Sequence, residues 1–433
     1  EIDNSLRFND DDNPSLSRAN DSGGSNTAGT LSFWTKRSEI NTGYLFFARS
    51  DDSNVFNVYF SNSSTNRLEI RSSQGGSVDF QYKTNMIFRD PAAWYHIVIA
   101  IDTTDGTAAD RCKLFVNGSR VTSFETQTNF GDSDTIELFQ SDATVYVTGE
   151  HEGGTIANPY DGYIADLNFV DGTQYDASNF GETNDNGVWI PKKFGGTQGT
   201  NGFRLEFKQT GTSANASGMG ADTSGNTNHL TPSNLTATDV TTDTPTNNFA
   251  TFNSLHKASN VTLSEANCKA AIAGAGQSRS VTATIAVSKG KWYWETKYTT
   301  DVVSAFFGLV SADIAWNINA TDYPSSGVSD NVGFNDGGTK YVNGSSSSYG
   351  SGFGNNDIIG VAANLDDDEV VFYVNGTAQN SGTAISKTFS GTYFFVVQHQ
   401  SGSGTSNFEI NFGNPSFAIS SGNADANGYG NFE

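Results

Sequence analysis

The chain has 433 residues, too long for one ordinary domain, and its 46 glycines, 31 phenylalanines and 16 tyrosines suit short strands joined by turns. With 24 Lys and Arg against 47 Asp and Glu, its formal net charge is −23 at pH 7. This charge excludes the basic surface that nucleic-acid binding requires and disfavours anionic membranes. No apolar stretch reaches the length of a membrane span, so we expect no membrane insertion.

The ends and the cysteines give two further expectations. The chain opens at Glu1 without a methionine and stops at Glu433, which favours a processed product or one part of a longer protein. Cys112 and Cys268 fall in different halves and form neither a disulfide framework nor a zinc site. We expect buried free thiols, because free cysteine is among the most buried residue types.

Short β-rich segments at regular spacing fill the first part of the chain. They are rich in aromatic and β-branched residues and are separated by polar turns. This cadence predicts an antiparallel sandwich or barrel. The segments are NSLRFN (4–9), TLSFWTKRS (30–38), GYLFFARS (43–50), NVFNVYFS (54–61) and RLEIRSS (67–73).

A long strand followed by a hairpin comes next. WYHIVIAID at residues 94–102 has the pattern of a half-buried strand, and RCKLFVNGSRVTSF at 111–124 places Asn117-Gly118 between two β-rich runs. Asn-Gly in this position predicts a type I′ turn, which needs positive φ at both central residues.

The same device returns in the second half of the chain. IIGVAANLD at residues 358–366 precedes EVVFYVNGTA at 369–378, which contains Asn375-Gly376. A repeated strand and Asn-Gly hairpin predicts one β-sandwich in each half.

The expected fold class is therefore all-β, with two antiparallel, jelly-roll-like β-sandwich domains joined by an extended connector. The first domain is expected at 1–207 and the second at 261–433. Residues 208–260 between them are rich in Asn, Thr, Ser and Gly, which indicates a connector draped over the domains.

Five segments of the first half, in order, carry a family resemblance. SLRFN, TLSFWTKRS, WYHIVIAID, KLFVNG and DGYIADLNFVDG resemble the laminin-G-like family of concanavalin A-like lectins and glucanases, over about residues 1–182. In the second half, GKWYWE, AFFGLV, DIIGVAANLDDDEVVFYVNG, TYFFVVQ and NFEINFG resemble a SPRY domain.

The two domains together, with their Asn/Ser/Thr-rich joints, resemble structural proteins of marine bacteriophages. This resemblance implies a fibre or surface protein on the outside of a virion, with other virion proteins as partners. Fibre proteins tend to be symmetric homo-oligomers, such as trimers.

No pattern for catalysis stands out. The glucanase relatives use Glu-x-Asp-x-x-Glu on one strand, where residues two apart share a face, and that spacing is absent. The acidic run 366–369 falls where the SPRY pattern expects a solvated turn. His96 lies within a strand, which favours a packed imidazole, and Trp292 and Trp294 are expected in the core. We expect no enzyme.

A stretch of the SPRY half is mostly loop and yet rich in aromatic residues. Saccharide sites commonly combine an exposed aromatic ring with amide and carboxylate partners, so this stretch predicts a shallow site for a host glycan or a partner loop. Burial of some of these rings in the core is the alternative. The candidate ligand-binding residues are Trp316, Asn317, Asp322, Tyr323, Tyr341 and Tyr349.

Calcium is the one cofactor that the laminin-G-like resemblance implies, at a rim of the sandwich. Carboxylates in two acidic turns offer the hard oxygen ligands that Ca²⁺ prefers. Against this, Ala165 stands where the family commonly has Asp, and solvated turns are the alternative. The candidate ligands are Asp10, Asp11, Asp12, Asp51 and Asp52.

Three functions remain open at this point. The leading hypothesis is a non-enzymatic virion surface or fibre protein that binds host-surface glycans through loops on a rigid scaffold. The second is a purely structural role, as capsid or tail decoration or as a protein–protein interaction module. The third is a glycan hydrolase or lyase.

Overall fold

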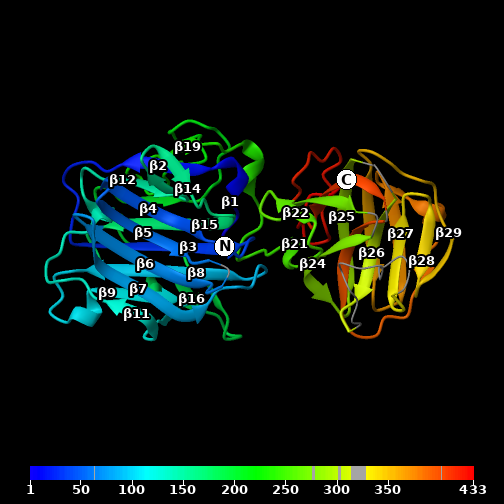
Figure 1. Ribbon diagram of the computed structural model, residues 1–433, viewed down its shortest axis with the longest axis horizontal. Helices are drawn as coiled ribbons and strands as arrows, with labels where there is room; N and C mark the ends of the chain where they lie inside the picture. The colour runs from blue at the N-terminus through cyan, green and yellow to red at the C-terminus, as the bar shows by residue number, and fades with distance from the viewer. Residues whose placement is uncertain (63, 276–277, 301–303, 314–327, 401) are drawn as a thin grey trace. The chain divides into compact units, whose positions relative to one another are not determined.

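The computed structural model describes residues 1–62, 64–275, 278–300, 304–313, 328–400 and 402–433. It divides into two compact units, Glu1–Asn248 and Phe249–Glu433 (Figure 1). The described regular structure is almost entirely antiparallel β, and its helical segments are short 3-10 turns, so the expected all-β class is confirmed. No described helix is long and apolar enough to cross a membrane.

Unit 1 is a sandwich of two eight-stranded sheets, which we call sheet A and sheet B. Sheet A has the order β10 (Ser119–Arg120), β9 (Cys112–Val116), β8 (Trp94–Asp102), β3 (Ala28–Arg37), β15 (Gly162–Asp171), β1 (Ser5–Phe8) and β20 (Val240–Thr241), with β18 (Phe203–Leu205) paired to β15. Sheet B has the order β11 (Phe124–Thr128), β7 (Ser77–Ile87), β6 (Arg67–Gln74), β5 (Asn54–Phe60), β4 (Gly43–Asp51), β12 (Thr144–Val147), β2 (Ser15–Ala19) and β19 (Thr231–Ser233).

Two small hairpins accompany these sheets, β13 (Glu150–Glu152) with β14 (Thr155–Ala157), and β16 (Gly181–Thr183) with β17 (Trp189–Pro191).

Unit 2 repeats the two-layer plan. Its seven-stranded sheet has the order β21 (Phe252–Lys257), β24 (Arg279–Val287), β34 (Tyr393–His399), β26 (Ala305–Ser311), β27 (Asn331–Asn335), β28 (Thr339–Val342) and β29 (Ser345–Ser348). Its eight-stranded sheet has the order β22 (Val261–Ser264), β23 (Lys269–Ala275), β35 (Ser403–Asn411), β25 (Lys291–Thr300), β30 (Ile358–Asn364), β31 (Glu369–Val374) and β32 (Thr377–Ala378), with β33 (Ile385–Ser386) paired to β31.

The cores follow from side-chain alternation. In β5, Phe56, Val58 and Phe60 all point inward and are fully buried in unit 1, while the residues between them face outward. The core of unit 2 includes Trp294 and Phe372. Burying one such side chain stabilises the folded state by roughly 1.5–3 kcal/mol. These aromatic-rich cores can therefore keep each unit folded, although the sequence has few long apolar runs.

Residues 208–248 belong to unit 1, which differs from the expected connector at 208–260. β19 extends sheet B and β20 extends sheet A. Met219 and Leu230 are fully buried, and Lys36 Nζ pairs with Asp243 Oδ2 at 2.7 Å with both side chains buried. Residues 249–260 belong to unit 2, where β21 pairs with β24. A few apolar anchors and two buried ion pairs, Lys36 with Asp243 and Arg7 with Asp239, therefore order a segment of polar composition.

Both Asn-Gly pairs lie at hairpin tips, as predicted. Asn117 and Gly118 have φ of 47° and 78° between β9 and β10, and Asn375 and Gly376 have φ of 48° and 73° between β31 and β32. Asn117 Oδ1 also accepts a hydrogen bond from the His96 backbone N–H at 2.8 Å. The type I′ geometry and this side-chain bond explain why asparagine stands before glycine.

His96 is a packed residue, as expected. Its ring stacks on Trp34 with centroids 4.7 Å apart and is 1% exposed. Trp189 Nε1 donates to His96 Nδ1 at 3.0 Å, so Nε2 carries the ring proton and donates to Ser32 Oγ at 3.0 Å. Burial lowers the pKa of His96 to about 3, which keeps the imidazole neutral.

Trp292 was expected in the core, and this expectation is wrong. Trp294 is 1% exposed, but Trp292 is 45% exposed and its Nε1 donates to the Lys289 carbonyl at 2.8 Å. Trp292 is the second residue of β25, at the end of the strand, where alternation no longer directs a side chain into the core.

The two hairpin glycines give a matched test of packing. An alanine Cβ at Gly118 would lie 2.5 Å from the Trp189 ring, whereas at Gly376 the nearest atom is 3.9 Å away. Both substitutions carry the left-handed backbone cost of about 1–2 kcal/mol. We expect Gly118→Ala to lower the unfolding free energy of unit 1 by about 1–3 kcal/mol more than Gly376→Ala lowers that of unit 2, measured by calorimetry. Equal losses would contradict the packing of Trp189 over the turn.

Candidate ligand-binding site

The register of the paired strands places five side chains in a row across the outer face of sheet B. Residues directly opposite in an antiparallel ladder point to the same face, and the sequence neighbours of these residues belong largely to the core. The row, called here the transverse row, runs through five strands from β12 to β7. It consists of Tyr146, Phe47, Asn57, Arg71 and Gln81.

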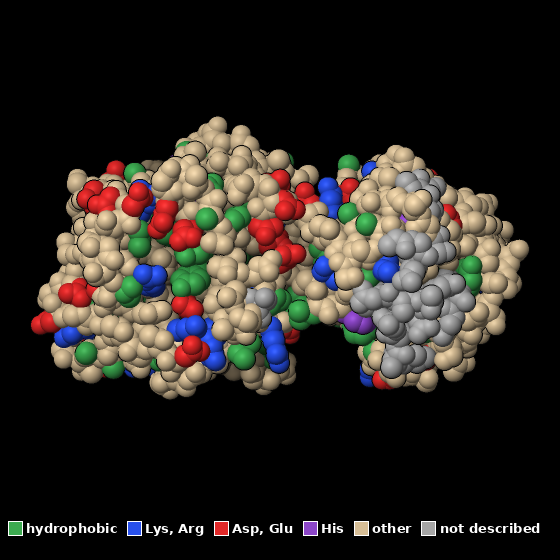
Figure 2. Space-filling view, in the orientation of Figure 1, with side chains coloured by type: hydrophobic (Ala, Val, Ile, Leu, Met, Phe, Trp, Pro, Cys, Tyr) green, Lys and Arg blue, Asp and Glu red, His purple; other side chains and the backbone are tan. Residues whose placement is uncertain are grey.

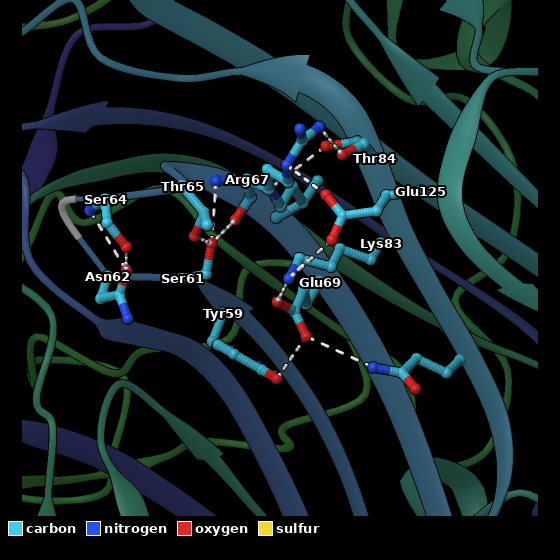
Figure 3. A network of polar contacts seen from close by, with 12 residues as sticks. Tyr59, Ser61, Asn62, Ser64, Thr65, Arg67, Glu69, Lys83, Thr84 and Glu125 are labelled. Carbon is cyan, nitrogen blue, oxygen red and sulfur yellow. Dashed lines mark hydrogen bonds and ion pairs between the residues drawn. The ribbon is translucent and has the colours of Figure 1, made fainter.

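A network of ion pairs, drawn in Figure 3, links β6, β7 and β11 of sheet B. Lys83 Nζ lies 3.3 Å from both Glu69 and Glu125, and Arg67 Nε lies 2.7 Å from Glu125. Tyr59 donates its hydroxyl to Glu69 at 2.6 Å. Burial, together with Glu69, raises the pKa of the Tyr59 hydroxyl, so it stays a donor. The charges of Arg67, Lys83 and the two glutamates are thus committed to one another.

Aromatic rings stack at two places on the same face. Tyr44 and Tyr59 stack with centroids 4.7 Å apart, and Tyr146 and His151 stack at 3.8 Å with nearly parallel planes. Tyr44 donates to Glu150 Oε1 at 2.9 Å, and burial raises the pKa of this hydroxyl. Burial also lowers the pKa of His151, which favours the neutral ring. The hairpin of β13 and β14 therefore rests on the aromatic part of the face.

A cleft of about 540 Å³ opens beside this hairpin. Arg49 pairs with Asp52 at 2.7 Å and donates to the His151 carbonyl at 2.7 Å, which fixes the guanidinium at its wall. An aromatic ring bordered by hydroxyl, carboxylate and guanidinium groups can bind a polyhydroxylated ligand. The side chains that line it include Arg49, Asp142, Thr144, Tyr146, His151, Ser15, Ser17 and Ile156.

No extended basic patch is visible on the face that Figure 2 shows; its Lys and Arg side chains lie as isolated groups, in line with the net charge of −23. This surface offers no footprint for a nucleic-acid backbone.

The two acidic turns proposed as calcium ligands lie apart. Residues 10–12 form a 3-10 turn after β1, next to Asp161 at the start of β15. Tyr44 near the start of β4 bridges Pro159, and Asp51 ends the same strand, roughly 20 Å further on at about 3.3 Å per residue. The two turns therefore cannot share one ion.

The turn at Asp51 and Asp52 is occupied by protein donors. Asp51 Oδ1 accepts from the backbone N–H groups of Ser53 and Asn54 at 2.7 and 2.9 Å, and these hydrogen bonds lower the pKa of Asp51. Asp52 pairs with Arg49. In the part of the chain that the structure describes, no three His, Cys, Asp or Glu side chains are arranged to hold a metal ion.

Asp161 is the residue that sequence reasoning missed at the first turn. It is 6% exposed, and its Oδ1 is buried without a hydrogen-bond partner. Burial, with Asp10, Glu39 and Asp11 nearby, raises the pKa of Asp161 well above its ordinary value. Sequence spacing gave no signal, because pairing of β1 with β15 brings residues 10 and 161 together.

The ligand site expected in the SPRY half divides between described and undescribed residues. Trp316, Asn317, Asp322 and Tyr323 lie outside the described residues, so that site stays a prediction. Tyr341 is half-buried with its ring edge toward Phe306, on the outer face of its sheet.

Tyr349 lies in the core of unit 2 and is 7% exposed. It packs on Phe334 and Phe372 and donates its hydroxyl to the Thr383 carbonyl at 3.0 Å. Packing, the alternative considered for these rings, accounts for its position.

Unit 2 has its own cleft, of about 340 Å³, between the eight-stranded sheet and residues 423–433. Tyr293 and Tyr373 form one wall, and Phe432 packs edge-on against Tyr293 with centroids 5.1 Å apart. Beneath them Glu295 accepts hydrogen bonds from Tyr293 and from the Glu433 backbone N–H, at 2.9 and 3.0 Å. This groove, with three aromatic rings in its lining, is suited to an apolar side chain of a protein partner.

Two regions of the chain match known families. Residues 9–178 match the family described as the concanavalin A-like lectin/glucanases superfamily, and residues 291–415 match the SPRY domain. No curated protein matches the chain.

Among solved structures, the SPRY domain of human HERC1 is similar at 16% identity over 37% of this chain and 96% of that one, with a TM-score of 0.31. The TRIM65 PSpry domain is similar at 13% identity over 37% and 88%, with a TM-score of 0.30. A heptameric SAP-like pentraxin from Limulus polyphemus is similar at 20% identity over 40% and 79%, also with a TM-score of 0.30. Similarity at this level says nothing of a ligand.

The family matches identify a concanavalin A-like domain followed by a SPRY domain, and together they indicate a carbohydrate- or protein-binding protein.

Proposed function

We propose that this protein is a non-catalytic glycan-binding protein on the outside of a virion, which holds host-surface saccharides against the outer face of sheet B. The observation that carries the proposal is the cleft of about 540 Å³, where Tyr146 lies among Arg49, Asp142 and Thr144. Aromatic rings pack against the apolar C–H faces of sugars, and the polar groups bind their hydroxyls. The lectin-like match over residues 9–178 supports a saccharide ligand. The virion location rests on the resemblance of the paired domains to phage structural proteins.

The outer face of sheet B also bears on catalysis. Glycosidases use two carboxyl groups, one of which carries a proton to the leaving group. Glu69 and Glu125 are the nearest acidic pair within the network of Figure 3, and both are held by Lys83. Both carboxylates are committed to cations, Glu69 to Lys83 and Glu125 to Lys83 and Arg67, which supports binding without hydrolysis.

A protein partner for unit 2 is the second candidate function. The aromatic groove at Tyr293 and Tyr373 favours it, because apolar pockets anchor protein interfaces. In this proposal unit 2 attaches the protein to another virion component while unit 1 faces the host. We also propose that the protein assembles as a symmetric homo-oligomer, such as a trimer. Light scattering, which gives the molar mass in solution, tests this.

The glycan site is tested with Tyr146→Ala. Loss of the aromatic ring removes about 1–2 kcal/mol of contact, so we expect roughly tenfold weaker binding to host cells and to the glycans that the unaltered protein selects on an array. Trp292→Ala is the matched control, because it removes an exposed aromatic ring in unit 2. Unchanged binding by the Tyr146 variant, or equal loss in both variants, contradicts a site in this cleft.

Calcium at the rim near Asp161 is a further part of the proposal. The orphaned buried Oδ1 of Asp161, with Asp10 close by, is the observation that favours a cation there. Ca²⁺ completes such sites with backbone carbonyls and water. Without a cation, the buried charge lowers stability.

Asp161→Asn separates these two effects. The pKa of Asp161 is raised in the folded state, so the folded protein holds this proton more tightly, and its stability falls as pH rises from 3.8 through the folded-state pKa. At pH 7 without calcium we expect the variant to be more stable by about 1–3 kcal/mol, whereas the control Asp185→Asn, at an exposed site, has little effect. Added calcium should raise the melting temperature of the unaltered protein only. If calcium and EDTA leave its melting curve unchanged, the calcium site does not exist.

A further inference from the structure

Arg71 is an uncompensated cation at the centre of the transverse row. It makes neither a hydrogen bond nor an ion pair with any described residue, and its Nε is buried. The neighbouring basic side chains on this face are all committed, Arg67 and Lys83 to glutamates and Arg49 to Asp52. A guanidinium presents a planar fork of donors that matches a carboxylate or a sulfate.

Two more polar groups beside Arg71 are also unsatisfied. Asn57 lies directly opposite Arg71 in the ladder of β5 and β6, and Ser73 follows on the same face of β6. Each is 5% exposed, and Asn57 Oδ1 and Ser73 Oγ are both buried without a partner. Buried polar groups in folded proteins are normally hydrogen-bonded, so this cluster is arranged for a ligand that carries donors and acceptors.

Aromatic rings flank the cluster. Tyr59 lies diagonally across the ladder of β5 and β6 from Arg71, because its direct partner there is Glu69, and it stacks on Tyr44 with ring centroids 4.7 Å apart. On the other side the transverse row passes through Phe47, which is fully buried next to His151, and reaches Tyr146 at the cleft. Tyr146 and Arg71 lie three strands apart, roughly 14 Å at the usual strand spacing. This span suits an extended chain of sugars better than a single ring.

One acidic side chain, that of Glu150, also lies close to the stacked tyrosines. Glu150 is engaged by neutral donors, the Tyr44 hydroxyl at 2.9 Å and Asn158 Nδ2 at 3.1 Å. Its carboxylate makes no ion pair with Arg71. The cation at Arg71 is therefore left for a ligand.

We propose that the outer face of sheet B binds an acidic oligosaccharide, with a carboxylate or sulfate of one sugar on Arg71 and Asn57 and the neighbouring sugars extending toward Tyr146. This inference rests on the proposed glycan-binding function and specifies its ligand class. Carboxylated and sulfated sugars share the chemistry that the guanidinium fork recognises.

The test compares acidic oligosaccharides with their neutral forms by calorimetry. The carboxylate arm uses oligogalacturonate and its methyl ester, and the sulfate arm uses a sulfated galactan oligosaccharide and its desulfated form. We expect the unaltered protein to prefer the acidic form at least tenfold in one arm, and that arm identifies the group. Arg71→Met should abolish this preference by lowering the affinity for the acidic form to about that of the neutral form, with an unchanged melting curve.

Two further variants keep the test decisive. Arg71→Lys retains the charge and loses the fork, so it should keep only part of the preference. Arg120→Met is the matched control, because it removes a surface arginine from sheet A that pairs with Asp110. If Arg71→Met does not fold, the preference of the unaltered protein and its partial loss in Arg71→Lys decide the question.

The outcomes separate this inference from the proposed function. Equal binding of acidic and neutral forms, with loss in Tyr146→Ala, overturns the acidic ligand and leaves the glycan site standing. An acidic preference that survives Arg71→Met also overturns the assignment to Arg71. Failure of every glycan, acidic or neutral, to bind overturns the glycan function and this inference together.

Discussion

Alternation of side chains along paired strands determines what unit 1 can offer to a ligand. Each sheet gives one face to the shared core, so only the residues between the core positions remain for recognition. The outer face of sheet A is covered, because Val98 and Val170 pack beneath Phe180 and Phe194 from the segment after β15. The outer face of sheet B instead carries the transverse row, the ion-pair network and the cleft. The topology thus leaves the outer face of sheet B, and not that of sheet A, for the proposed site.

The polar groups on the two outer faces also differ in whether they have partners. Beside sheet A, the cation of Lys36 is fully buried and paired with Asp243, and the ring of His96 has partners at both nitrogens. A satisfied buried pair orders the chain that covers it, and breaking such a pair costs about 3–5 kcal/mol. On sheet B the guanidinium of Arg71 and the amide of Asn57 have no partner among the described residues. Leaving such buried polar groups without partners lowers stability, and the ligand that we propose would supply the missing partners.

Sequence patterns predicted the architecture better than the site. The Asn-Gly pairs defined both hairpins because φ and side-chain chemistry are local, and the β-rich composition of residues 54–61 correctly indicated a strand there. Register is not local: nothing in the sequence aligns Asn57 with Arg71, or brings Asp161 to the acidic turn at 10–12. Polar composition likewise concealed the few buried apolar residues that fix 208–248 to unit 1. Trp292 shows a different limit. Alternation predicts which face of a strand a side chain lies on, but it does not predict how far the core extends along that face.

The net charge of −23 determines how an acidic ligand would be recognised. A polyanion is repelled at long range, but at physiological ionic strength this repulsion is screened beyond roughly 8 Å. Binding then depends on contacts inside that distance, where one uncompensated guanidinium faces the ligand with an amide and stacked rings beside it. Nucleic-acid binding differs, because its affinity grows with the number of neutralised phosphates and needs many basic residues. A single arginine on an acidic protein provides specificity for a particular arrangement of anion and sugar ring, and excludes polyanions that lack it.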